Sequence, residues 1–92
     1  MSKVKSAFDD LFEPEDAANL KIRANLMQKI KLFIKDSGFT QKRAAEKMNV
    51  HQPLVSDLMR GRINRFSIDQ LVNMSTAIGM SVSLEVSIPD AA

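Results

Sequence analysis

The chain has 92 residues and a formal net charge of +2, and a chain this short holds one domain with one modest hydrophobic core. It contains no cysteine and a single histidine, His51, which excludes disulfides, Cys-based zinc sites, thiol nucleophiles and histidine clusters. With 45% hydrophobic and 26% charged residues, it is too apolar for a disordered protein and too often interrupted by polar residues for a membrane span.

The N-terminal stretch, residues 1–13, comes first in chain order. It lacks the apolar core of a signal peptide, so we expect a cytoplasmic protein that does not contact the membrane. The segment Ala7–Glu13 is acidic, and Phe8, Leu11 and Phe12 form a small apolar face on it. This segment is either an arm that docks on a protein partner or a segment that packs onto the first helix.

A long helix is predicted to begin at Glu13-Pro14. Proline is tolerated in a first helical turn, and the acidic residues that follow favour the positive end of the helix dipole. Gly38 is a suitable left-handed stop for this helix. Apolar residues at three- and four-residue spacing form one stripe along it, and they are Ile22, Leu26, Met27, Ile30, Phe33 and Ile34.

Two short helices joined by a tight turn are predicted next. Thr40 can cap a helix over 41–48, and Pro53 falls in the first turn of another helix, which stops before Gly61. The Ala44-Ala45 pair lets two helix backbones approach closely, as a perpendicular crossing requires.

The hydrophobic pattern of the second short helix leaves one choice open. Leu54 and Val55 compete for the same place in the core, and periodicity alone leaves one of them nearer the surface.

A final helix and one strand complete the predicted chain. Ser67–Gln70 matches a capping box and opens a helix that ends at Gly79. Residues 80–88 then alternate apolar and polar side chains, which is the period of a strand, until Pro89. Because a lone strand leaves its backbone groups unpaired, we expect it to pair with its copy in a second subunit. The alternative is a tail that folds back on the helices.

The charges are segregated along the chain. Residues 1–20 carry −3, residues 21–65 carry +8, and residues 66–92 carry −3. A basic middle flanked by acidic ends indicates a polyanionic partner. Lysine and arginine also solvate the polar faces of helices, and charge alone does not separate these two interpretations.

The stretch from Thr40 to Arg62 resembles a known family. Its Thr-Gln, Ala-Ala, Gln-Pro, Val-Ser-Asp-Leu and Arg-Gly-Arg pattern is similar to the helix-turn-helix of the XRE family, the lambdoid phage repressor and Cro-like proteins. With its terminal strand, the chain looks like the small single-domain subgroup that includes HigA-type antitoxins. Asn49 stands where the family usually has Gly, and His51 where it usually has Ser or Thr. Asn tolerates left-handed geometry, so the turn is kept.

The resemblance implies a mainly α-helical, lambda-repressor-like domain of about five helices, with one C-terminal β-strand that pairs across a homodimer. The chain then divides into an N-terminal arm (1–13), a helical DNA-binding domain (14–79, with the helix-turn-helix at about 40–61), a dimerisation strand (80–88) and a tail (89–92). The residues expected to make the strand pairing are Val82, Leu84 and Val86.

The function implied by the resemblance is a repressor that reads a palindromic operator in double-stranded DNA, with the helix after His51 in the major groove. Gln52 is the strongest candidate for base reading, because its amide can pair bidentately with adenine. The full base-reading set is His51, Gln52, Pro53 and Ser56. The residues expected on the DNA backbone are Thr40, Gln41, Lys42, Arg43, Arg60, Arg62 and Arg65. Asp57 is expected to pair with a nearby arginine, since a phosphate would repel it.

Other function classes remain beside this one. The alternative within the resemblance is the antitoxin of a type II toxin–antitoxin module, which neutralises a RelE/HigB-like ribonuclease through the acidic arm and autoregulates its operon. An enzyme is disfavoured because the chain has no Cys, no Tyr and no Gly-rich phosphate loop, so we expect no catalytic residue, metal or cofactor. An RNA-binding module is disfavoured because the chain has no Trp or Tyr stacking platform.

Overall fold

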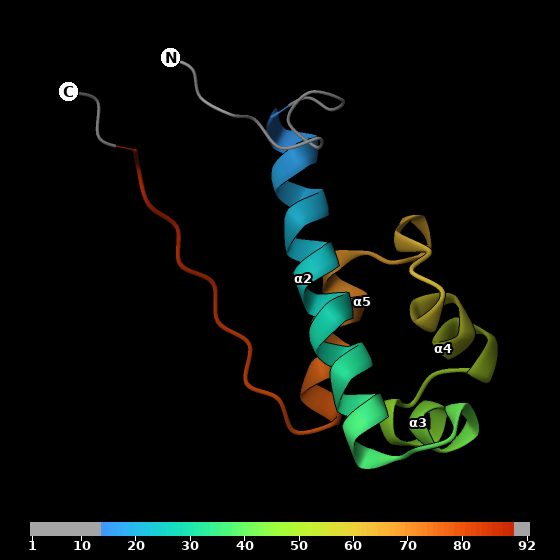
Figure 1. The fold of residues 1–92 in the computed structure, drawn as a ribbon. Helices are drawn as coiled ribbons and strands as arrows, with labels where there is room; N and C mark the ends of the chain where they lie inside the picture. The colour runs from blue at the N-terminus through green and yellow to red at the C-terminus, as the bar shows by residue number, and fades with distance from the viewer. Residues whose placement is uncertain (1–13, 90–92) are drawn as a thin grey trace.

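The computed structural model of the protein describes residues 14–89, and this part of the chain is mainly helical, as expected (Figure 1). Its α-helices are α2 Pro14–Ser37, α3 Gln41–Met48, α4 Gln52–Met59 and α5 Ile68–Ala77, with a 3-10 helix, η1 Ile63–Arg65, between α4 and α5. About five helices were predicted, and the described residues form four α-helices and this one short 3-10 helix. None of the described helices is long and apolar enough to cross a membrane.

The core lies where α2, α5 and the α3–α4 pair meet. The long helix α2 packs along α5, and α3 contacts both α4 and α5 (Figure 1). Val55 is fully buried and Leu54 lies at the edge of the core, which decides the choice that periodicity left open. The buried residues of this central cluster are Met27, Ile30, Ile34, Ala44, Ala45, Met48, Val55, Leu58, Phe66, Leu71 and Met74.

Side-chain and backbone caps set the ends of α3. The Thr40 hydroxyl accepts a hydrogen bond from the backbone N–H of Arg43 at 3.0 Å, which satisfies one of the free amides of the first turn. At the other end, Asn49 is left-handed, with φ 59° and ψ 45°, and Val50 donates its N–H to the carbonyl of Ala45 at 3.0 Å. The predicted turn between the two short helices is therefore formed with Asn in place of Gly.

The ends of α4 and α5 also follow the predicted signals. Gly61, with φ +74°, turns the chain out of α4 toward η1. The Ser67 hydroxyl accepts a hydrogen bond from the N–H of Gln70 at 3.1 Å and opens α5.

The predicted C-terminal strand is not seen in the described chain. Residues 80–89 are extended but belong to no strand, and they run back in the direction of the N-terminal end of α2 (Figure 1). A β-strand is defined by hydrogen bonds to a neighbouring strand, and residues 81–89 make no backbone hydrogen bond to another described residue. Alternation of side chains predicts the extended conformation, whereas the pairing requires a second strand that residues 14–89 do not supply.

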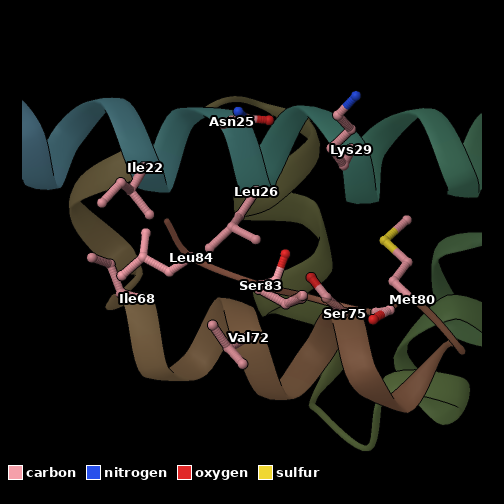
Figure 2. Close-up of a pocket in the computed structure, with 12 residues that line it drawn as sticks. Ile22, Asn25, Leu26, Lys29, Ile68, Val72, Ser75, Met80, Ser83 and Leu84 are labelled. Carbon is pink, nitrogen blue, oxygen red and sulfur yellow. The ribbon is translucent and has the colours of Figure 1, made fainter. Parts of the chain in front are cut away.

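The first part of this C-terminal segment lies against the helices, as the alternative interpretation expects. Met80–Leu84 forms one wall of an apolar groove of about 430 Å³ whose other walls are α2 and α5. Figure 2 shows Leu84 between Ile22 of α2 and Ile68 of α5. The rest of the segment has no such cover, because Val86 is 81% exposed and Ile88 is 93% exposed.

Candidate nucleic-acid interface

Helix α4 is held by one face and leaves the other face open. Ala44 and Ala45 on α3 are buried, and their small side chains allow α3 and α4 to pack closely. Val55 and Leu58 are 0% and 1% exposed, so they fix the inner face of α4. Residues one helical turn apart share a face, which places the polar side chains of the N-terminal half of α4 outward.

The N-terminal end of α4 presents the predicted base-reading residues to solvent. His51 is the N-cap, with extended backbone, and its side chain caps nothing. His51, Gln52 and Pro53 are exposed and Ser56 is half-buried. No side-chain hydrogen bond joins His51, Gln52 or Ser56 to another residue of the described chain. The first turn of α4 carries no acidic residue, so the positive end of its dipole is not neutralised locally.

The predicted backbone-contacting residues lie at the start of α3 and after the end of α4. At α3, Gln41 is half-buried while Thr40, Lys42 and Arg43 are exposed, and the first turn again holds no acidic residue. A helix N-terminus of this kind favours an anion such as phosphate. After α4, the exposed arginines are Arg60, Arg62 and Arg65.

Two of the basic side chains of this surface are paired with carboxylates. Nη1 of Arg43 lies 3.2 Å from Oε1 of Glu46, and Nη1 of Arg62 lies 3.4 Å from Oδ1 of Asp57. The expectation that Asp57 pairs with a nearby arginine is thus confirmed. Within residues 14–89, Lys42, Arg60 and Arg65 form no ion pair, so their charges are available to a polyanion.

A comparison with protein-family models matches residues 7–87 to a helix-turn-helix domain. The chain belongs to this helix-turn-helix family. Helix-turn-helix domains bind DNA through the second helix of the motif, so the family makes this protein a DNA-binding regulator. A search among curated proteins gives no significant match.

Arg23, on α2, makes a contact that the sequence does not predict. Its Nη1 donates to the backbone carbonyl of Ile63, the first residue of η1, at 3.0 Å and to that of Phe66, the residue after η1, at 3.2 Å. Its Nε donates to Oδ1 of Asn19 at 2.6 Å. The two carbonyls are 40 and 43 residues away in the chain, so no local motif signals this contact.

The sequence predicts two segments that contact another protein, and the structure describes only the second of them. The acidic arm, residues 1–13, lies outside the described residues, so the toxin contact expected of it stays a prediction. The alternating C-terminal residues are described, and Val82, Leu84 and Val86 are 38%, 69% and 81% exposed. The apolar surface of this segment is therefore only partly covered by α2 and α5 within the described chain.

Proposed function

We propose that this helix-turn-helix protein is a sequence-specific repressor of the XRE type, which binds a palindromic operator as a homodimer. The observation that carries the proposal is the N-terminal end of α4, where Gln52 is exposed, has no hydrogen-bond partner among the described residues and sits beside no carboxylate in the first turn. A side-chain amide in this position is suited to bidentate pairing with adenine in the major groove.

In the proposal, the residues near Gln52 also contact bases in the major groove. Ser56 lies one turn after Gln52 on the same face of α4, and its hydroxyl can donate to or accept from a base edge. Pro53 is exposed and can contact a thymine methyl, and His51 can donate to a base or a phosphate. We propose these four residues as the base-reading set.

The backbone contacts come from both ends of the motif. In the proposal, Gln41 and the free amides at the start of α3 hold a phosphate on one side, together with Thr40, Lys42 and Arg43. Arg60, Arg62 and Arg65 hold the backbone on the other side of α4. These contacts carry no sequence information, and they fix the register in which Gln52 meets its base.

The first prediction concerns salt. Each phosphate neutralised on binding lowers the slope of log K against log salt by about 0.9, so five engaged cations give about −4.5 per subunit. We expect a steep negative slope in fluorescence-anisotropy titrations with duplex DNA across salt concentrations. Arg65→Ala should reduce the slope by about 0.9. Lys29→Ala should leave the slope unchanged, since Lys29 lies on α2 at the wall of the apolar groove that α2 forms with α5 and Met80–Leu84, and not on the helix-turn-helix (Figure 2). An association constant that does not change with salt would contradict the proposal.

The dimer is proposed to form through the C-terminal segment. Residues 80–88 are extended and span about 30 Å, and their unpaired backbone groups form an edge that a second copy can pair with. Val82 and Leu84 line the groove against α2 and α5 yet stay 38% and 69% exposed, and Val86 is 81% exposed, so a paired copy would cover the apolar surface that the helices leave open. A two-fold symmetric arrangement of this kind matches the symmetry of a palindrome.

The second prediction tests this dimer. Val86→Asp should weaken self-association by about 100-fold, because an apolar side chain worth about 1.5 kcal/mol is lost from the interface in each of the two subunits. Ser87→Asp is the matched control, since it adds the same charge on the opposite face and should have a smaller effect. The measurement is sedimentation equilibrium over a range of protein concentrations. Equal effects of the two variants, or a wild-type protein that is monomeric at the concentrations at which it binds DNA, would contradict the proposed dimer.

A further inference from the structure

The three arginines after α4 belong to a short connection that needs an anchor. Arg60 is the C-cap of α4, Gly61 turns the chain with φ +74°, and Arg62 precedes η1. Phe66 is 3% exposed and fixes the far end of the connection in the core. Between these ends Arg65 is exposed, so its direction depends on how η1 is held.

Arg23 supplies that anchor from another helix. Its guanidinium donates to the carbonyl of Ile63, the first residue of η1, and to the carbonyl of Phe66, the residue after its end. The Phe66 carbonyl has no other hydrogen-bond partner in the described chain. Asn19, one turn before Arg23 on α2, accepts from Nε at 2.6 Å and thereby orients the guanidinium plane.

Several features make this contact specific to arginine. Nη1 donates to both carbonyls while Nε of the same planar guanidinium donates to Asn19, so the contact uses two nitrogens held in a fixed relation, whereas a lysine ammonium has a single nitrogen. Arg23 is half-buried, and its Nε and Nη1 donate to protein acceptors, which suits holding η1 better than contacting DNA.

We propose that Arg23 is a positioning residue for DNA binding: by bridging both ends of η1 it fixes the direction in which Arg62 and Arg65 meet the phosphates. This inference rests on the proposed function, because it assigns a role within the same interface. Arg23 itself is not expected to touch DNA, and its effect passes through η1.

The test is a set of variants measured for DNA affinity and for salt dependence. Arg23→Gln should lower affinity about three- to tenfold and make the slope of log K against log salt shallower by about 0.9 or more, since a disordered η1 loses a phosphate contact. Arg23→Lys should restore part of the affinity. Lys29→Gln removes one positive charge from the same helix without touching η1, and it should change affinity by less than about twofold.

A double-mutant cycle separates positioning from general stability. If Arg23 acts through Arg62 and Arg65, Arg23→Gln should have little further effect in an Arg62→Ala, Arg65→Ala background. The same relative loss in both backgrounds would overturn the proposal, as would wild-type affinity in Arg23→Gln. Urea unfolding shows whether Arg23→Gln still folds. If Arg23→Gln does not fold, Asn19→Ala makes a milder change to the same contact and should lower affinity as well.

Hydrogen exchange provides a readout that needs no DNA. In Arg23→Gln, the amides of Arg65 and Phe66, which bond to the carbonyls of Arg62 and Ile63, should lose more protection than amides within α3. A wild-type protein that does not bind DNA would defeat the proposed function while the exchange result still reports on the Arg23 contact. Unchanged protection of these two amides would overturn the anchoring itself.

Discussion

Replacing Gln52 by alanine is expected to cost about 1–3 kcal/mol of binding free energy on the preferred DNA sequence, which is roughly 5- to 150-fold in affinity. The side chain is exposed and hydrogen-bonds to no other described residue, so its loss should leave folding nearly unchanged. On random duplex DNA the same variant should bind almost as well as wild type, because an amide that reads a base contributes little to sequence-independent binding.

Arg62→Ala is the matched control for Gln52→Ala. Arg62 is expected to contact phosphate, so its loss should weaken binding to preferred and random duplexes by the same factor. The variant also leaves Asp57 without its arginine partner, and the resulting repulsion of phosphate is equally independent of sequence. Competition titrations with both duplexes measure the two ratios. Equal losses on both duplexes for Gln52→Ala would show that this residue reads no base.

Leu58→Ala is expected to have the largest effect on stability, a loss of about 2–5 kcal/mol. Leu58 is 1% exposed and lies on the inner face of α4, so the truncated side chain leaves a cavity within the helix-turn-helix itself. For a domain of this size the loss is a large share of a total of about 5–15 kcal/mol. DNA binding should fall in proportion to the unfolded fraction as temperature or urea rises.

Leu32→Ala provides the comparison for Leu58→Ala, since Leu32 is 44% exposed on α2. It should change the free energy of unfolding by less than about 0.5 kcal/mol. Urea denaturation monitored by circular dichroism gives both values. Similar small losses in the two variants would mean that α4 is not packed as described.

The helices could be predicted because their ends carry local signals. Thr40 and Ser67 accept hydrogen bonds from amides three residues later, and such caps depend only on neighbouring residues. Gly61 and Asn49 mark left-handed positions for the same local reason. The choice between Leu54 and Val55 required the structure, because periodicity gives the direction of a face but not the position of the helices that cover it.

Contacts between distant parts of the chain left no such signal. Arg23 was predicted only as one of the charges of the basic middle segment, yet it donates to the carbonyls of Ile63, at the start of η1, and of Phe66, directly after η1. Acceptors on the backbone carry no residue-type preference, so a sequence pattern cannot identify them. The strand predicted at residues 80–88 is not seen in the described chain on related grounds: their alternation predicts an extended conformation, and a strand also needs a paired neighbour, which residues 14–89 do not supply.

The proposed repressor reads bases with α4 as part of a symmetric pair. Selection of bound duplexes from a random library, followed by sequencing, tests this most directly. For the wild type we predict enrichment of a palindrome whose half-site centres are about 34 Å apart, or roughly one helical turn of DNA. With Gln52→Ala we predict a relaxed base preference at one position of each half-site. A bound pool with no common sequence would contradict the central claim.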